Sequence, residues 1–328
     1  MFFPASIRSF ATVATTRNPR ILVTGSLGQL GTGLVSLLRN KYGAQNVIAS
    51  DVRKPSTDIK KAGPYVFADV LNFQQLETIV VDQEIDWIIN LSALLSAVGE
   101  QHMERALAIN MSGFANTLEL AKKHNLRIMC PSTIGAFGPT TPREMTPDLT
   151  TMRPTTIYGI TKIHVELMGE YYNKRFGVDF RCLRYPGIIS ADTEPGGGTT
   201  DYAVQIFHSA LKEKKYNCYL GPETTLPMMY LPDCLEGTVS FLSAPTESLT
   251  QRTYNVAAFS FSPQEIAAKI KERIPEFEIT YAPDSRQKIA DSWPKSLDDK
   301  MARKDWGWTN KYDLDGMVDD MLTKLNKE

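Results

Sequence analysis

The chain has 328 residues, and its hydrophobic content of 42% and charged content of 22% are those of an ordinary globular protein. Its 36 Lys and Arg nearly balance its 37 Asp and Glu, so no global charge attracts nucleic acid or an anionic membrane surface. No apolar run approaches the roughly 20 residues of a membrane-spanning helix, and the cysteines and histidines lack metal-ligand spacing. We therefore expect no nucleic-acid partner, no membrane segment and no metal site.

The amino-terminal segment differs from the rest of the chain. Residues 1–18 are rich in Ser and Thr, carry Arg8 and Arg17, and contain no acid, since the first acidic residue is Asp51. This composition is typical of a mitochondrial transit peptide, and a frayed tail is the alternative interpretation. We expect a targeting segment at residues 1–18 and a location in the mitochondrial matrix.

From residue 20 onward, apolar runs alternate with amphipathic stretches. Strands are predicted at about 20–25, 46–51, 65–70, 86–93, 126–133 and 178–186. Helices are predicted at about 28–40, 73–82, 101–123 and 155–175. This alternation is typical of a parallel sheet with helices on both faces. The expected fold class is α/β, with a Rossmann-type doubly wound parallel sheet.

The rhythm changes after Pro186, where a Gly/Thr-rich loop leads into a predicted helix at about 201–214. Residues 232–258 repeat the order of helix and strand, so we expect parts of this segment to return to the main sheet. The predicted domains are a Rossmann domain (19–187 plus about 232–258) and a smaller carboxyl-terminal α/β lid (about 188–231 and 259–328).

The stretch VTGSLGQLG places three glycines where the first strand turns into the first helix. A side chain there would obstruct the approach of a pyrophosphate, and the helix terminus offers free N–H groups and the positive end of its dipole. Asp51 ends the second strand, where a carboxylate can accept hydrogen bonds from ribose hydroxyls. The predicted contacts are Gly25, Ser26, Leu27, Gly28, Gln29, Leu30, Gly31, Asp51, Val52 and Arg53.

These features together predict a dinucleotide site in the Rossmann domain. The carboxylate of Asp51 repels a 2′-phosphate, which favours NAD over NADP as the cofactor, although Arg53 could pair with such a phosphate. Asp69 and Val70 follow the third strand, where they can contact the adenine edge.

The stretch YGITK combines Tyr158 and Lys162 at the start of a predicted helix, where their spacing projects both side chains from one face. A free phenol has a pKa of about 10 and is a poor base at neutral pH, but a neighbouring ammonium favours the phenolate. Thr133 follows the fifth strand, with Ser132 beside it, and supplies a hydroxyl that can fix a substrate oxygen. Tyr-x-x-x-Lys also occurs by chance in helices, but downstream of a nucleotide loop we interpret it as a proton-transfer pair.

The glycine turn, the acid after the second strand, the Ser/Thr pair and YxxxK resemble the extended short-chain dehydrogenase/reductase superfamily from about residue 20 to 260. More narrowly, PSTIGAFGP, RCLRYPGIIS and GGGTTDYAVQIFH are similar to strings of the short-chain L-threonine 3-dehydrogenase family. The likeness continues through DSWPKSLDDKMARKDWGW near the carboxyl end.

This resemblance implies NAD-dependent oxidation of L-threonine at its 3-hydroxyl to 2-amino-3-ketobutyrate. Tyr158 is then the general base, Lys162 favours the phenolate and holds the nicotinamide ribose, and Thr133 orients the substrate hydroxyl. Further cofactor contacts expected by analogy are Asn90, Leu91, Ala93, Asn110, Tyr185, Gly187 and Ile188. The superfamily also implies a homodimer that pairs the two long helices with their copies.

A zwitterionic substrate needs hydrogen bonds for a carboxylate and for an ammonium group. The loop GGGTTDY suits this need, with two threonine donors, an aspartate acceptor and glycines at 196–198 that allow closure over a small ligand. The alternative interpretation of the loop is a plain connection that caps the next helix. Trp293 could form a wall of the lid, and a packing role is its alternative interpretation. The predicted substrate contacts are Ser96, Thr133, Tyr158, Thr199, Thr200, Asp201 and Trp293.

Two other functions fit parts of the sequence. A nucleotide-sugar epimerase or dehydratase of the same superfamily would share these motifs, but such enzymes usually have a larger substrate domain with basic groups for a diphosphate. An NAD-binding regulator without catalysis would be expected to lack Tyr158 or Lys162, and both are present. We therefore favour the dehydrogenase.

Overall fold

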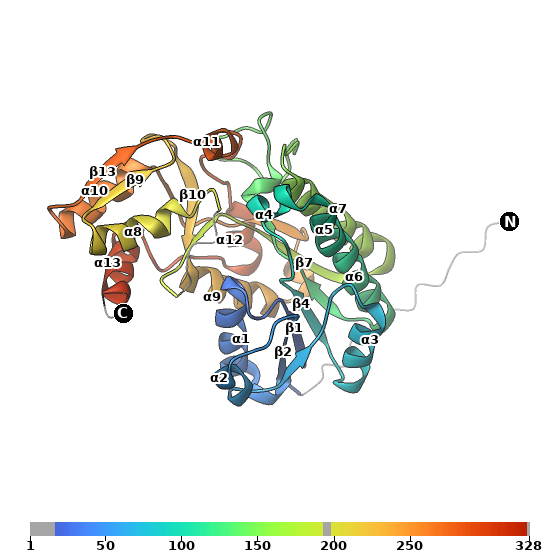
Figure 1. Ribbon diagram of the computed structural model, residues 1–328. Coiled ribbons are helices and arrows are strands. Elements are labelled where there is room, and N and C mark those ends of the chain that lie inside the picture. The colour runs from blue at the N-terminus through green and yellow to red at the C-terminus, as the bar shows by residue number, and fades with distance from the viewer. Residues whose placement is uncertain (1–16, 193–197, 327–328) are drawn as a thin grey trace.

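The computed structural model describes residues 17–192 and 198–326, so most of the predicted targeting segment at residues 1–18 lies outside the described residues. Within these ranges, eight strands form one sheet in the order β11-β7-β5-β4-β1-β2-β3, with β6 beside β7 (Figure 1). Neighbouring strands run parallel, which confirms the predicted Rossmann-type sheet. The strands are β1 (Ile21–Thr24), β2 (Val47–Asp51), β3 (Tyr65–Phe67), β4 (Trp87–Asn90), β5 (Arg127–Met129), β6 (Ser132–Thr133), β7 (Asp179–Tyr185) and β11 (Thr253–Asn255).

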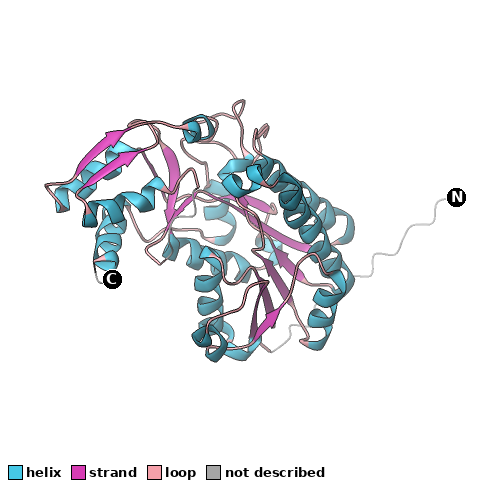
Figure 2. Ribbon diagram, in the orientation of Figure 1, coloured by secondary structure: helices cyan, strands magenta, loops and turns pink. Residues whose placement is uncertain are grey.

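Helices cover both faces of this sheet, which explains why its central strands are apolar on both sides (Figure 2). On one face α1, α9 and α12 share a core cluster that includes Leu34, Phe241 and Trp306. On the other face α3, α6 and α7 pack around Phe114 and Val165. The helices are α1 (Gln29–Tyr42), α3 (Phe73–Asp82), α6 (Gly113–His124), α7 (Ile157–Phe176), α9 (Leu231–Ser243) and α12 (Lys300–Trp306).

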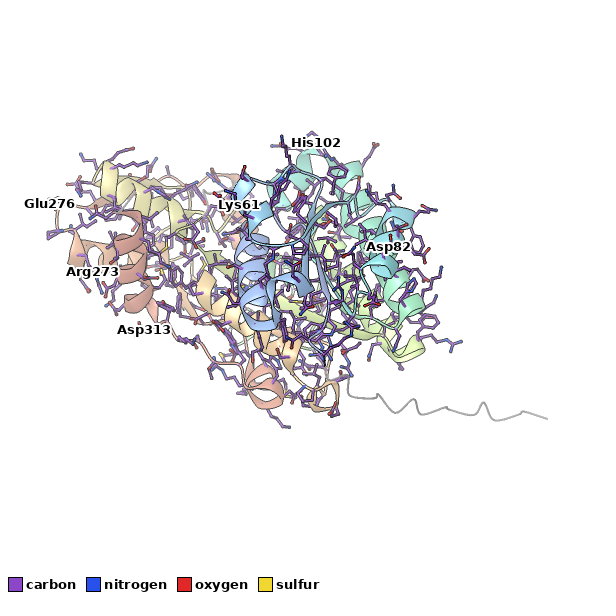
Figure 3. All side chains as sticks on the ribbon, turned by 90° about the horizontal axis from the view of Figure 1, so that it is seen from below. Lys61, Asp82, His102, Arg273, Glu276 and Asp313 are labelled. Carbon is purple, nitrogen blue, oxygen red and sulfur yellow. The ribbon has the colours of Figure 1, made fainter. Side chains whose placement is uncertain are left out.

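A second, smaller unit lies beside the main sheet and has its own core, which includes Tyr202, Phe207 and Phe261 (Figure 1). Arg273, at the periphery in Figure 3, joins α10 (Pro263–Arg273) to α13 (Leu314–Leu325) through an ion pair with Asp319. The unit contains a sheet of β8 (Gly187–Ile189), β10 (Leu226–Tyr230) and β12 (Phe259–Phe261), the pair β9 (Lys215–Cys218) and β13 (Glu278–Tyr281), and helices α8 (Tyr202–Lys212), α10 (Pro263–Arg273), α11 (Ser285–Ala290) and α13 (Leu314–Leu325).

A helical stretch covers the range predicted at 101–123, but it begins at Met103 and contains a π-helical turn. α4 (Ser96–Gln101) precedes it and ends before His102, which leaves the helical region at φ −134° and ψ 60°. From there α5 (Met103–Leu107), the π-helical turn (Ala108–Ser112) and α6 follow one another without a break to His124. Asn110, within this turn, makes a tertiary contact, since it exchanges two hydrogen bonds with the backbone of Leu94.

Three smaller differences concern the edges of elements. The strand predicted at 126–133 is divided into β5 and β6, and the break contains Pro131, which has no N–H to contribute to a ladder. β3 ends at Phe67, before Asp69 and Val70. The structure also adds a short helix, α2 (Thr57–Lys61), whose first turn is capped by the Ser56 side chain.

Candidate active site

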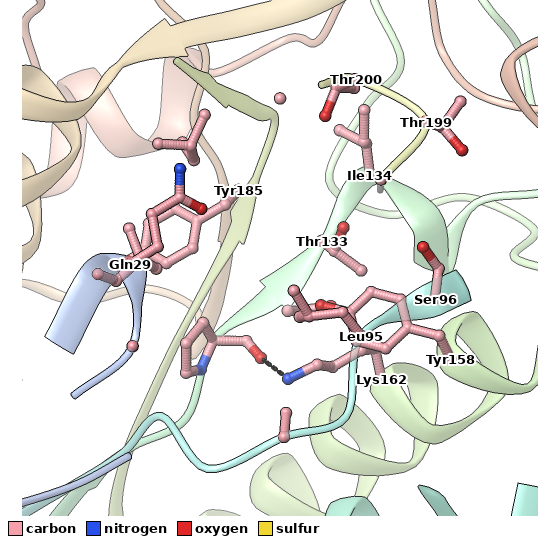
Figure 4. A pocket seen from close by; sticks show the side chains of 18 of the residues that line it. Gln29, Leu95, Ser96, Thr133, Ile134, Tyr158, Lys162, Tyr185, Thr199 and Thr200 are labelled. Atoms are coloured by element: carbon pink, nitrogen blue, oxygen red, sulfur yellow. Dashed lines mark hydrogen bonds between the residues drawn. The ribbon is translucent and has the colours of Figure 1, made fainter. Parts of the chain in front are cut away.

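A cavity of about 490 Å³ lies at the carboxyl ends of the main strands, where parallel sheets bind ligands (Figure 4). The predicted site residues that line it are Gly25, Gly28, Gln29, Leu30, Gly31, Leu91, Ala93, Ser96, Thr133, Tyr158, Lys162, Tyr185, Gly187, Ile188, Thr199, Thr200, Asp201 and Trp293. The lining also includes residues that the sequence did not single out as contacts, namely Leu94, Leu95, Val98, Pro131, Ser132, Ile134, Pro186 and Gly198. Most of these additional residues are apolar. Pro131, Ser132, Ile134, Pro186 and Gly198 lie within the quoted family strings, whereas no motif marked Leu94, Leu95 and Val98.

The glycine turn leaves no room for side chains. Gly25 has φ +67°, and a Cβ on it would lie 2.8 Å from the carbonyl carbon of Leu91. A Cβ on Gly31 would lie 2.5 Å from the Gly25 oxygen. The first-turn N–H groups of α1 have no acceptor within the helix, and its N-cap, Gly28, has no side chain to satisfy them. This cradle fits the phosphates of a dinucleotide.

Asp51 stands at the end of β2, below the glycine turn. One carboxylate oxygen accepts a hydrogen bond from the Leu27 N–H at 3.0 Å, and the other accepts from the Arg53 N–H and Nε. The Arg53 side chain is 60% exposed, and Val52 is also exposed. Ser26 is buried beneath the turn. Asp51 thus orients the turn and also pairs with the Arg53 side chain.

Asp69 and Val70 lie outside the lining of the cavity. The Asp69 carboxylate accepts a hydrogen bond from the Leu71 N–H at 2.9 Å. Val70 is buried against Gly113 of α6, where a Cβ on the glycine would lie 2.7 Å from Val70 Cγ2. The Val70 carbonyl accepts from the Asn116 side chain. The Val70 side chain therefore packs beneath α6, which leaves Asp69 as the more accessible of the two.

Two predicted asparagines also lie outside the lining and use their side chains within the protein. Asn90 accepts hydrogen bonds from Thr24 Oγ1 and the Ser92 N–H, so it fixes the end of β4. Asn110 joins the Leu94 backbone to Thr161 Oγ1. Because these amides have protein partners, we assign them to positioning the walls of the cavity.

Tyr158 and Lys162 occupy the first two turns of α7, which begins where the Thr156 side chain accepts a hydrogen bond from the Gly159 N–H. Lys162 Nζ lies 5.6 Å from the centre of the Tyr158 ring and donates a hydrogen bond to the Pro131 carbonyl at 2.8 Å (Figure 4). Burial opposes the charge of Lys162, but the combined attraction of Tyr158, Cys130, Cys182 and Glu166 outweighs this effect, and the pKa of the ammonium lies above its usual value. Lys162 therefore keeps its proton at neutral pH.

Thr133 ends β6 and lines the same cavity. Its hydroxyl oxygen accepts a hydrogen bond from the Gly135 N–H at 3.1 Å, which leaves the hydroxyl proton free for a ligand. Gly159 allows α7 to approach this segment, since a Cβ there would lie 2.2 Å from the Gly135 carbonyl oxygen. The glycine of the YGITK stretch thus brings the tyrosine and the threonine hydroxyl into one cavity.

The far end of the cavity carries neutral polar groups. Ser96 is the first residue of α4, and Thr199 and Thr200 precede α8 (Figure 4). Asp201 accepts a hydrogen bond from the Gly198 N–H at 2.8 Å. Trp293 is buried, and its carbonyl accepts from Arg143. Gly196 and Gly197, which we expected to permit closure of the loop, lie outside the described residues.

Charge is sparse in this cavity. Among its described lining residues, Lys162 is the only cation and Asp201 the only acid. Elsewhere in residues 17–192 and 198–326, His, Cys, Asp and Glu side chains form no cluster of three or more that could hold a metal ion. No helix of the described chain combines the length and apolar character needed to cross a membrane.

The model of the NAD dependent epimerase/dehydratase family matches residues 21–257, which is most of the chain. The chain belongs to this family. Within the family it is similar to a pig (Sus scrofa) protein named "L-threonine 3-dehydrogenase, mitochondrial", with 55% identity over 97% of this chain and 86% of the relative.

Solved structures of family members extend the comparison. L-Threonine dehydrogenase from Phytophthora infestans is 52% identical, with a TM-score of 0.91, and the match covers 94% of this chain and 99% of that one. A monomeric L-threonine 3-dehydrogenase from a metagenome is 42% identical, with a TM-score of 0.89 over 94% of this chain and 99% of its own. These identities confirm the resemblance to the L-threonine 3-dehydrogenases that the sequence motifs indicated.

Proposed function

We propose that the chain catalyses the NAD-dependent oxidation of L-threonine at its 3-hydroxyl, giving 2-amino-3-ketobutyrate. The observation that carries this proposal is that Tyr158, Lys162 and Thr133 line the same cavity as the glycine turn. A proton acceptor, a fixed cation and a hydroxyl donor are the groups that removal of hydrogen from an alcohol requires. NAD, when bound, supplies the acceptor for the hydride.

The roles of the three side chains follow from their surroundings. The Tyr158 oxygen takes the proton of the substrate hydroxyl, and the Lys162 ammonium lies one helical turn away, 5.6 Å from the centre of the tyrosine ring. Thr133 donates its free proton to the substrate oxygen and holds it beside the phenol. The nucleotide is held by the α1 terminus through its phosphates and by Asp51 through a ribose.

The character of the cavity favours a small zwitterion as the substrate. Ser96, Thr199 and Thr200 offer hydroxyl donors for a carboxylate, and Asp201 offers an acceptor for an ammonium group. Lys162 is the only cation among the described lining residues, and it already donates to the Pro131 carbonyl. A nucleotide sugar brings a second diphosphate, for which this lining provides no arginine or further lysine.

We also propose a homodimer in the mitochondrial matrix. α7 carries an apolar outer face with Ile160, Leu167 and Tyr171 exposed, as expected for a helix that packs against a copy of itself. The pig relative is named as mitochondrial. The mass of the protein in solution tests the homodimer, and the mass of a single chain would contradict it. Cell fractionation of the full chain tests the location, and a protein found in the cytosol would contradict it.

The central test incubates purified protein and NAD with L-threonine, L-serine or a nucleotide sugar. We expect NADH to form with L-threonine. Tyr158→Phe should lower kcat roughly 10²-fold or more while NAD binding is retained, because general-base catalysis is lost. Tyr281→Phe is the matched control, since it removes the same hydroxyl from a tyrosine of β13 that does not line the cavity.

Each contrary outcome identifies a different function. Epimerisation of the nucleotide sugar without NADH from threonine would favour the epimerase. NAD binding with no turnover of any substrate would favour the regulator. Wild-type turnover in Tyr158→Phe would exclude the proposed base.

A further inference from the structure

A buried ion pair lies directly behind the wall of the cavity that carries Thr133. Arg184 of β7 contacts both carboxylate oxygens of Glu166 on α7, at 2.9 Å and 2.8 Å. The Ser132 hydroxyl donates a short hydrogen bond to the same carboxylate. Ser132, Glu166 and Arg184 are only 2%, 3% and 4% exposed. No motif in the sequence indicated this cluster.

The two residues of β6 face opposite ways, as neighbours in a strand do. Thr133 faces the cavity, whereas the Ser132 hydroxyl turns inward to Glu166. In the parallel ladder Ser132 is paired with Arg184, so the guanidinium stands beside the serine. The preceding carbonyl, of Pro131, receives the Lys162 ammonium. Three consecutive residues thus provide an anchor for Lys162, a contact with Glu166 and the hydroxyl that faces the ligand.

α7 holds this segment at two points. Lys162 and Glu166 are four residues apart and therefore lie on one face of the helix. Lys162 binds the Pro131 carbonyl, and Glu166 binds the neighbouring Ser132 hydroxyl. A strand of two residues has little ladder of its own to hold it. Its position relative to the Tyr158 turn of α7 therefore depends on these two contacts.

Stability alone does not explain the ion pair. A buried pair often stabilises a fold no more than apolar residues of the same volume, because both charges lose their hydration. Burial opposes the charge of Arg184, but its hydrogen bonds to Glu166, together with the charge attraction of Glu166, Cys182 and Asp148, outweigh this effect and raise the pKa of the guanidinium above its usual value. Arg184 also donates to the Asp148 carbonyl and to Asn255 Oδ1. The carboxylate is consequently fixed in place and remains a strong acceptor for Ser132.

We propose that Glu166, fixed by Arg184, is a positioning residue that sets the distance between the Thr133 hydroxyl and the Tyr158 phenol by holding Ser132. This inference rests on the proposed oxidation, in which both groups touch the same substrate oxygen. Glu166 itself does not line the cavity. Losing its contact with Ser132 should therefore impair the chemical step more than the binding of NAD.

The test is the Ser132→Ala variant, which removes the hydroxyl and leaves the ion pair intact. We expect kcat with threonine and NAD to fall roughly tenfold to a hundredfold, since small misplacements of reacting groups have effects of that size. The dissociation constant of NAD, measured by calorimetry, should stay within about twofold, because the groups that hold the phosphates are untouched. Amide hydrogen exchange in residues 130–136 should become faster.

The fold offers a matched control at the other end of β7. There the Thr246 hydroxyl donates to Asp179 at 2.8 Å, and that carboxylate is paired with the buried Arg181. Thr246→Ala removes the same kind of hydrogen bond far from the cavity, so kcat and the exchange of 130–136 should stay as in the wild type. Glu166→Gln, checked for folding by its melting temperature, should lower kcat at least as much as Ser132→Ala.

The outcomes separate this inference from the proposed function. If the wild type forms no NADH from threonine, the proposed function fails, and the exchange measurement still decides whether Ser132 orders the segment. Unchanged kcat and unchanged exchange in Ser132→Ala would overturn the positioning role. An equal loss of kcat in Thr246→Ala would also overturn it, because the effect would then be one of general stability.

Discussion

The glycine turn permits a prediction whose size follows from the structure. In Gly31→Ala the new Cβ would lie 2.5 Å from the Gly25 oxygen and 2.7 Å from two backbone atoms of Ser26. Side-chain Cβ atoms in proteins essentially never approach another atom within 3.0 Å, so the backbone of the turn must move by at least about 0.5 Å. That backbone is the part of the chain that we propose to face the phosphates of NAD.

Forcing an extra carbon into such a contact costs about 1–3 kcal/mol, which corresponds to a roughly 5- to 150-fold change in an equilibrium constant. The gain in helix propensity from Gly to Ala, up to about 1 kcal/mol, offsets part of that cost. We therefore expect the dissociation constant of NAD to rise roughly tenfold, measured by isothermal titration calorimetry. The melting temperature without NAD should change little.

Gly33→Ala is the matched control on the same helix. A Cβ on Gly33 would also meet an atom at 2.5 Å, but that atom is Cδ1 of Leu235, the end of a flexible side chain that can rotate away. Both substitutions have the same effect on helix propensity, so their difference isolates the clash with the backbone of the turn. Equal NAD affinities in the two variants would refute the reasoning.

Two further predictions concern carboxylates. Asp51→Ser removes the acceptor for the Leu27 N–H and frees Arg53. The preference for NAD over NADP, measured as the ratio of their dissociation constants, should therefore fall roughly 10- to 100-fold. An unchanged ratio would contradict this prediction. Burial would raise the pKa of Asp179, but Arg181 and Arg127 hold it below its usual value of 3.8, so its contribution to stability is present above about pH 4 and is lost as the pH falls further. Asp179→Asn should lower the free energy of unfolding by about 3 kcal/mol at neutral pH. Its melting temperature should then fall less steeply than that of the wild type as the pH drops below about 4, and an unchanged fall would exclude this role.

The main sheet could be predicted because its signal is local. β1 reads as an uninterrupted apolar run since both of its faces are buried, and its neighbours β2 and β4 follow the same rule. The π-helical turn at Ala108–Ser112 could not be predicted in this way. The contact that accompanies it is between Asn110 and the backbone of Leu94, a partner 16 residues away that no helical periodicity reports.

The same distinction applies to the candidate site. Glycines at a turn and a tyrosine four residues before a lysine are visible as spacings, and the structure brings them into one cavity. The apolar walls, such as Leu94 and Val98, have no comparable mark. The sequence indicated Thr133 as the substrate hydroxyl but gave no role to Ser132 beside it, which the fold turns to the opposite side of the strand.

The opposite orientations of Ser132 and Thr133 explain why the fold places the ion pair of Glu166 and Arg184 behind an otherwise apolar wall. The groups proposed to act on one substrate oxygen come from α7 and from β6, which are separated along the chain by the segment from Ile134 to Thr156. A connection of that length cannot fix a distance to a fraction of an ångström, so side chains that join the two elements must do so. Lys162 and Glu166 extend from the helix that carries the tyrosine to the strand that carries the threonine. The element that carries the proposed base therefore also holds in place the hydroxyl with which we propose that the base acts.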